Sequence, residues 1–271
     1  MSYIILEIIM GVAFIGMLIS AKKQSSNSLA KPLVFVFAFV LIACGIIVLV
    51  KRMGPPDTEK YVNEKLTFTK SAGYKLARFF AESTSGGQVV IFRDPTREDN
   101  KFQQALIEGL KKGFAPEITN VIVTSPLLHR PSTKAAKDKP ISELLKSADI
   151  NKILKRYSKC KIIVSLAGLP KDIKDLNLLH EFINKSPKTP KIALLNCRIK
   201  DMYKFMKAGF ISAVVYPNPS KKYSEDVPSD DLQKTFDMRY LLITPKNMDE
   251  ISKEFPGRVF RRSAATPPTK K

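Results

Sequence analysis

Hydrophobic residues dominate two stretches at the start of the chain, Tyr3–Ser20 and Pro32–Val50, with a short polar segment between them. The first stretch contains one charged residue, Glu7, and the second contains none. About 20 apolar residues in a helix cross the hydrocarbon core of a bilayer. The pattern predicts a double-pass transmembrane hairpin with helices at about 3–20 and 32–50, so that the lipid bilayer is the partner of both segments.

Two other interpretations of this N-terminal region stay open. A cleaved signal peptide normally begins with basic residues, and this chain begins Met-Ser-Tyr. A buried helical hairpin of a soluble core rarely tolerates two such long apolar runs. The membrane hairpin is therefore the interpretation that we favour.

The basic residues beside the two runs bear on orientation. Lys22, Lys23 and Lys31 lie in or beside the connecting segment, which favours a cytoplasmic loop and an extracytoplasmic domain. Lys51 and Arg52 directly follow the second run and argue for the opposite orientation. On balance the sequence predicts an inner-membrane protein whose large domain is extracytoplasmic.

Residues 53–87 are expected to form a helical stalk or linker, whose helix over 58–82 could stand free or lie on the following domain. From residue 88 to 257, short β-rich runs alternate with helical patterns, which predicts an α/β fold: a three-layer, parallel-sheet, flavodoxin-like domain. Residues 258–271 read as a disordered basic tail. The predicted strands are Gln88–Arg93, Ile118–Thr124, Cys160–Ala167, Lys191–Asn196, Ile211–Tyr216 and Arg239–Thr244.

The net charge of +20 favours anionic partners such as lipid head groups or nucleic acid. The basic residues are spread along the chain, however, which is typical of a solubilising surface, and we do not expect a nucleic-acid partner. Cys160 and Cys197 begin and end different predicted strands, so their thiols should lie about 20 Å apart and remain free.

In open α/β sheets, ligands bind beyond the carboxyl ends of the strands. The polar residues expected there suit hydrogen bonding to a small polar ligand better than bond-making, although ordinary loop and capping roles would explain them as well. The candidate ligand-binding residues are Asp94, Thr96, Asn100, Ser125, Ser165, Asn196 and Tyr216.

Catalytic motifs are missing from the sequence. It has no GxxxxGK[ST] phosphate loop, no dinucleotide fingerprint and no GxSxG elbow. Its two histidines, His129 and His180, have no neighbours at metal-ligand spacing. Asp94 ends a strand as in a response-regulator receiver, but an acceptor aspartate after the third strand is lacking. We therefore predict no catalytic residues, metal or cofactor, and favour a binding module over an enzyme.

The span from Gln88 to about Pro219 resembles one lobe of the type I periplasmic-binding-protein-like fold. The resemblance rests on the segments QVVIFRDPTREDNKFQQALIEGLKKGF, CKIIVSLAGLP and KIALLN…MKAGFISAVVYP. It implies solute binding outside the membrane, with Asp94, Thr96 and Asn100 facing the cleft. The second lobe of that family is lacking, so ligand enclosure would require two chains to pair as a homodimer.

These inferences predict a membrane-anchored binding or assembly component of the cell envelope that recognises a small polar ligand or a protein partner. One alternative is a membrane-tethered enzyme that uses Asp94, Ser125, Ser165 and Asn196. Another is a basic domain that docks nucleic acid or anionic lipid.

Overall fold

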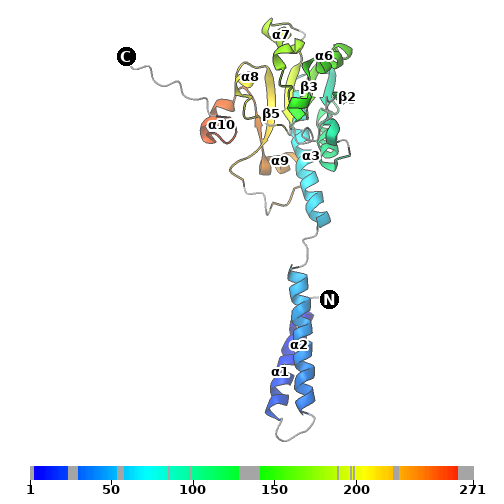
Figure 1. Ribbon diagram of the computed structural model, residues 1–271, viewed down its shortest axis with the longest axis vertical. Coiled ribbons are helices and arrows are strands. Elements are labelled where there is room, and N and C mark those ends of the chain that lie inside the picture. The colour runs from blue at the N-terminus through cyan, green and yellow to red at the C-terminus, as the bar shows by residue number, and fades with distance from the viewer. Residues whose placement is uncertain are drawn as a thin grey trace, which may run out of the picture. The chain divides into compact units, whose positions relative to one another are not determined.

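The structure is a computed structural model, and it divides into two compact units, Met1–Tyr61 and Val62–Lys271 (Figure 1). The residues that the structure describes are 3–23, 30–53, 58–84, 86–97, 99–127, 141–187, 189–195, 197, 199–221 and 226–261.

The first unit is a pair of helices, α1 (Tyr3–Lys22) and α2 (Ala30–Met53). They pack closely at Gly16, where a Cβ atom would lie 2.7 Å from Cζ of the Phe37 ring. Among the described residues, one segment, Ala30–Val48, is long and apolar enough to cross a membrane. The apolar part of α1, Ile8–Lys22, is shorter. One helix thus has the length and composition of a membrane span, and the predicted two-helix hairpin is not confirmed.

The second unit is built on one six-stranded sheet in the order β2-β1-β3-β4-β5-β6. Strands β1 to β5 are parallel, and β6 is antiparallel to β5. The order 2-1-3-4-5 is that of flavodoxin-like folds, which confirms the predicted α/β class. The sheet is mixed and not all parallel as predicted, because the chain enters β6 beside the carboxyl end of β5, where Tyr240 pairs with Pro217, and runs back along it. The strands are β1 (Gln88–Phe92), β2 (Asn120–Thr124), β3 (Cys160–Ser165), β4 (Lys191–Leu195), β5 (Ile211–Pro217) and β6 (Tyr240–Ile243).

Helices cover both faces of this sheet, because alternate strand residues point to opposite sides. Val89 and Ile91 face a core that includes residues of α3 (Thr58–Ser83), α4 (Lys101–Phe114) and α9 (Leu232–Arg239). Val90 and Phe92 face a second core, to which the remaining helices contribute. These are α6 (Ser147–Arg156), α7 (Asn177–Ile183), α8 (Tyr203–Lys207) and α10 (Met248–Glu254); the shorter helices are η1 (Pro95–Arg97), α5 (Ile141–Leu144) and η3 (Ile173–Asp175).

Helix α3 is part of the α/β unit from Val62 onward. A Cβ atom at Gly109 of α4 would collide with the carbonyl oxygen of Lys70, and one at Gly73 of α3 with that of Leu106. The two helices therefore cross in backbone contact. The Arg239 guanidinium lies 3.4 Å from the centroid of the Phe68 ring and joins α9 to the same helix. The sequence left open whether this helix stands free, and the structure has it packed on the domain.

The C-terminal end of the described chain also differs from the prediction. Val259 and Phe260 are buried in the second core, and the Arg261 N–H donates to the Lys200 carbonyl (2.8 Å). Two apolar side chains that fill a core outweigh the local basic and proline-rich composition. Residues 258–261 are therefore ordered parts of the domain, contrary to the prediction, and residues 262–271 lie outside the described residues.

Candidate functional site

The carboxyl ends of β2, β1 and β3 meet at the point where the strand order reverses. The Arg93 N–H donates to the Thr124 carbonyl (2.9 Å), and the Leu166 N–H donates to the Phe92 carbonyl (2.8 Å). These bonds continue the hydrogen-bond pattern of the sheet beyond the strand ends, so the loops that follow β1, β2 and β3 begin side by side. Ligands of open α/β sheets bind at such a switch point.

Asp94 is the most deeply buried charged residue of this edge, with 3% of its surface exposed. Its Oδ1 accepts hydrogen bonds from the N–H (2.8 Å) and hydroxyl (2.6 Å) of Thr96. Its backbone is held by Gln103, which accepts from the Asp94 N–H (2.8 Å) and donates to the Asp94 carbonyl (3.0 Å). Asp94 and Thr96 therefore fix the turn that connects β1 to α4.

Asn100 is the N-cap of α4. Its Oδ1 accepts from the N–H groups of Phe102 (2.8 Å) and Gln103 (3.3 Å), which would otherwise be unpaired at the start of the helix. The structure brings Asn100 together with Asp94 and Thr96, since Gln103 contacts both ends of this loop. The capping role that the sequence left open for such residues is the one that the geometry gives to Asn100.

Two serines complete the edge. Arg93 Nε donates to Ser125 Oγ (2.5 Å), and a guanidinium cannot act as a base. Ser165 is 2% exposed, and its hydroxyl donates to the Gly168 carbonyl (2.6 Å). These contacts order the loops after β2 and β3, but they do not turn either hydroxyl into a nucleophile.

Cys197, which was not among the predicted site residues, also lies at this edge. Its thiol contacts the carbonyl oxygens of Ser165 (3.4 Å) and Leu195 (3.1 Å). Burial, with a smaller contribution from the charge of Asp94, raises the pKa of the thiol to about 12. A thiol that stays protonated is a poor nucleophile. Its position two residues after β4 is the sequence feature that could have predicted Cys197 as a residue of this edge.

The remaining two candidates do not join this group. Tyr216 lies on β5, separated from β1 by two strands, and its hydroxyl donates to the Arg258 carbonyl (3.1 Å). Asn196 lies outside the described residues.

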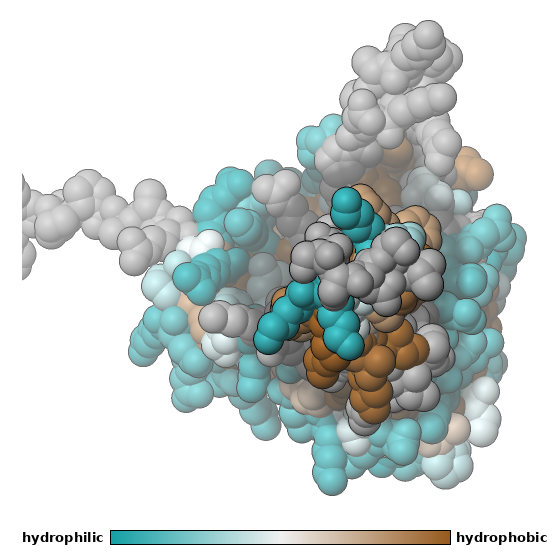
Figure 2. All heavy atoms as spheres, turned by 90° about the horizontal axis from the view of Figure 1, so that it is seen from below, coloured by the Kyte–Doolittle hydropathy of each residue, from teal (hydrophilic) through white to brown (hydrophobic). Residues whose placement is uncertain are grey.

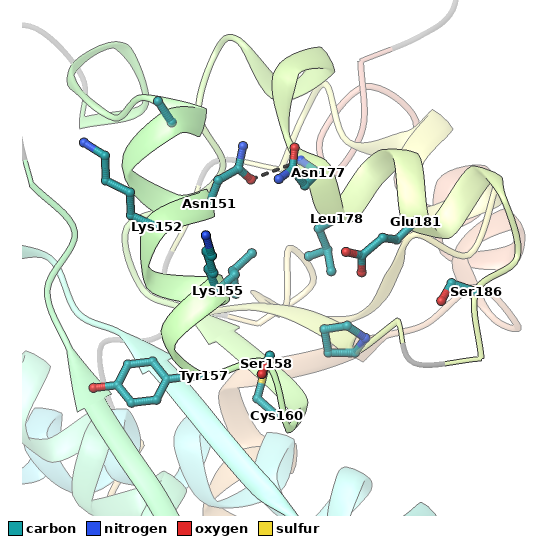
Figure 3. A pocket seen from close by; sticks show the side chains of 13 residues that line it. Asn151, Lys152, Lys155, Tyr157, Ser158, Cys160, Asn177, Leu178, Glu181 and Ser186 are labelled. Carbon is teal, nitrogen blue, oxygen red and sulfur yellow. Dashed lines mark hydrogen bonds between the residues drawn. The ribbon is translucent and has the colours of Figure 1, made fainter.

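A groove of about 570 Å³ opens at the opposite, amino edge of the sheet, between α6 and α7 (Figure 3). Cys160, at the start of β3, and Pro190, just before β4, contribute to its lining. Lys155 stands on the α6 wall, and Glu181 stands on the α7 wall. Burial, with a smaller contribution from Glu181, raises the pKa of the Cys160 thiol to about 11. This groove was not predicted from the sequence, because ligands of open α/β sheets are expected beyond the carboxyl ends of the strands.

Within the part of the chain that the structure describes, no three His, Cys, Asp or Glu side chains lie close enough together to hold a metal ion. His180 is exposed on α7, and His129 lies outside the described residues. Cys160 and Cys197 are free thiols, as predicted.

No family model and no curated protein match this sequence. Among solved structures, similar ones include an ABC-transporter solute-binding protein from Burkholderia graminis in complex with D-arabinose (14% identity, TM-score 0.41, 66% of this chain and 61% of that chain). Another is a sugar-binding protein of a sugar ABC transporter from Bacillus halodurans (15%, 0.43, 67% and 64%). A third is a periplasmic solute-binding protein from Actinobacillus succinogenes with bound D-allose (12%, 0.41, 67% and 62%).

This chain thus spans somewhat more than three fifths of the length of each of these three proteins. They are solute-binding proteins of the kind that the sequence resembles. At these identities the likeness concerns the α/β fold alone.

Proposed function

We propose that this protein is a membrane-anchored binding component of the cell envelope. In this proposal α1 and α2 cross the inner membrane as a hairpin, and the α/β unit lies on the extracytoplasmic side. The unit recognises a small polar ligand or a protein partner through the loops at the carboxyl edge of its sheet.

The observation that carries the proposal is the exposure of apolar side chains on α2. Phe35 is 77% exposed, Phe39 73% and Ile42 62%, and only 6% of the Ala30–Val48 segment is buried within the protein. Figure 2, seen from below, shows hydrophobic side chains gathered on the described part of the helix pair and mainly hydrophilic ones on the visible face of the α/β unit. Each large apolar side chain left in water forfeits about 1.5–3 kcal/mol relative to burial. A bilayer provides that burial.

Helix α1 supports the second crossing. Its 20 residues extend about 30 Å, which matches the hydrocarbon core, and Val12, Phe14 and Ile15 are at least half exposed. The packing of Gly16 against Phe37 is the close contact that small residues permit between membrane helices.

Topology can be tested by cysteine labelling of the full chain in spheroplasts with a membrane-impermeant maleimide. Lys253→Cys on α10 should be labelled in intact spheroplasts, and Lys23→Cys at the end of α1 only after permeabilisation. Labelling of both from the same side would contradict the crossing by α2, on which the hairpin depends, and protection of Lys253→Cys alone would reverse the orientation. Labelling of the unsubstituted protein measures the background from the native thiols.

The carboxyl edge supports binding rather than chemistry. Its loops are held in place by the contacts of Asp94, Asn100 and Ser165, so little ordering is required when a ligand arrives. Arg93 and Ser125 are half-buried there and offer polar groups to a neutral hydroxylated molecule. Pairing of two chains, or docking of a partner protein, would cover the single lobe.

Ligand binding is testable by thermal unfolding of the full chain in detergent with neutral monosaccharides such as D-arabinose. We expect a rise in Tm that Asp94→Asn abolishes, because the substitution removes the charge at the switch point but retains an acceptor oxygen. Asp99→Asn, in the same loop but exposed, is the matched control and should keep the rise. A rise that survives Asp94→Asn would contradict the assignment of this edge.

A further inference from the structure

The groove between α6 and α7 lies away from the edge discussed above. Its lining residues come from α6, the turn before β3, the start of β3, α7 and the turn before β4. The turns before β3 and β4 lie at the amino ends of the strands, and the groove extends from there along α6 and α7. Its volume of about 570 Å³ falls within the range of small-molecule sites.

Two opposite charges face each other across this groove. Lys155 on α6 and Glu181 on α7 are both exposed, and Figure 3 shows them on facing walls. With the described residues, neither side chain forms an ion pair or a hydrogen bond. Charged neighbours do pair: Lys152 lies 3.5 Å from Asp149, and Lys171 lies 2.7 Å from Glu143. The groove thus holds one cation and one anion that the fold does not use.

The walls that carry these charges are joined at one end of the groove by Asn151. Its Oδ1 accepts from the Asn177 N–H (3.0 Å), and its Nδ2 donates to the Asp175 carbonyl (3.1 Å). These bonds join α6 to the start of α7, as the dashed line in Figure 3 shows for the first of them. The two charges are therefore presented by elements of fixed spacing, which lowers the cost of binding a ligand between them.

The rest of the lining is mixed. Leu154, Leu178, Pro190 and Cys160 supply apolar surface, and Ser158 and Ser186 supply hydroxyl groups. Leu178 and Cys160 are buried, whereas Leu154 and Pro190 are half-buried. An apolar group of a ligand could therefore contact this hydrophobic surface between the two charged walls.

We propose that this groove binds a small zwitterion, an α-amino acid with an apolar side chain. The ammonium group would pair with Glu181, the carboxylate with Lys155, and the side chain would contact Leu178 and its apolar neighbours. A simple anion would be repelled by Glu181 and a simple cation by Lys155. A neutral sugar would leave both charges without a partner. A zwitterion satisfies both walls at once.

The test is binding of L-leucine to the full chain in detergent, measured by saturation-transfer NMR. Lys155→Met and Glu181→Gln should each weaken binding about tenfold, as expected for one charge-assisted contact near the surface. Lys152→Met is the matched control. It lies on the same helix, already pairs with Asp149, and points away from α7 in Figure 3, so binding should be unchanged.

Ligand analogues sharpen this test. N-acetyl-leucine lacks the ammonium group, and leucinamide lacks the carboxylate. Each should bind about tenfold more weakly than leucine to the unsubstituted protein. Glu181→Gln should remove the preference for leucine over N-acetyl-leucine, and Lys155→Met should remove the preference over leucinamide.

Three results would overturn the proposal. The first is no saturable binding of leucine up to about 10 mM, a concentration that would mostly fill a millimolar site. The others are binding of N-acetyl-leucine as tight as that of leucine, and equal effects of Lys152→Met and Lys155→Met on leucine binding. None of them bears on the carboxyl edge, which is probed with a neutral sugar and Asp94→Asn. Failure of one proposal is therefore distinguishable from failure of the other.

Discussion

The two edges of the same sheet use their polar residues differently. At the carboxyl edge, Asp94, Asn100 and Ser165 are engaged in hydrogen bonds that fix turns and cap a helix. At the amino edge, Lys155 and Glu181 face each other across a groove without such partners among the described residues. A polar residue at a conventional site position can be fully occupied by the fold. A charge that the fold leaves unused is a more direct pointer to a ligand.

The α3–α4 contact joins two helices that cover one face of the sheet, so the largest effect is expected from Gly109→Ala. The added methyl group would collide with the Lys70 carbonyl, and backbone cannot move aside as a flexible side chain can. We expect a loss of about 3 kcal/mol or more in the free energy of unfolding. Urea unfolding of the full chain in detergent, followed by circular dichroism, measures it. Lys112→Ala, on the exposed side of α4, should change stability by less than about 0.5 kcal/mol; equal effects would refute the close crossing.

Removal of the Asp94 carboxylate should have the next largest effect. Asp94→Ala leaves the N–H and hydroxyl of Thr96 without their acceptor, in a place where Asp94 itself is 3% exposed. The expected loss is about 2–3 kcal/mol, whereas Asp94→Asn, which retains an acceptor, should lose about 1 kcal/mol. The same unfolding assay applies. If alanine is tolerated as well as asparagine, the structural role assigned to this edge is wrong.

Each edge has one thiol, and their raised pKa values predict a pH effect. The pKa is about 11 for Cys160 and about 12 for Cys197, against an ordinary value of 9.0. Between pH 9 and the raised pKa values, both thiols stay protonated in the folded protein but lose their protons in the unfolded chain. The contribution of the protonated thiols to the free energy of unfolding is therefore complete below about pH 9, and it is lost as the pH rises from 9 toward the folded pKa values. From pH 8 to pH 10 the native protein should lose about 1–2 kcal/mol more than the Cys160→Ala/Cys197→Ala double variant. Parallel pH profiles of the two proteins would contradict the burial of the thiols.

The smallest effect on stability is expected from the charges of the groove. Lys155→Met and Glu181→Gln should each alter the free energy of unfolding by less than about 0.5 kcal/mol, because neither side chain contacts a partner in the described fold. The same variants should weaken leucine binding. A large loss of stability in either variant would mean that the charge supports the fold, and the contrast between the edges would disappear.

Much of the α/β architecture could be predicted from the local pattern. The strand positions were predicted within a few residues, because runs such as Val89–Phe92 and Ile162–Val164 are continuously apolar and buried on both faces. The flavodoxin-like class followed from alternating strands and helices. The packing of α3 on the domain was not decided by sequence. It depends on glycines of α3 and α4 that meet only after folding.

The positions of the candidate site residues could be predicted from the sequence, but whether their polar groups are already hydrogen-bonded within the fold could not. Strand ends give the positions of Asp94, Ser125 and Ser165, since polarity rises where a buried strand stops. Whether a hydroxyl or carboxylate is occupied depends on partners such as Gln103 and Gly168, whose hydrogen-bonding roles come from the folded loops. The α6–α7 groove was invisible to the sequence, because Lys155 and Glu181 are 26 positions apart and each looks like an ordinary surface residue.

The sequence by itself determined the apolar segments at the N-terminus and the order of elements in the α/β unit, since both follow from runs and periods of side chains that are neighbours along the chain. Only the tertiary structure decided which polar groups are hydrogen-bonded or ion-paired within the fold and which face a groove. That distinction depends on distances between residues remote in sequence, and hydrogen bonds and ion pairs form only where folding brings such residues within a few ångströms.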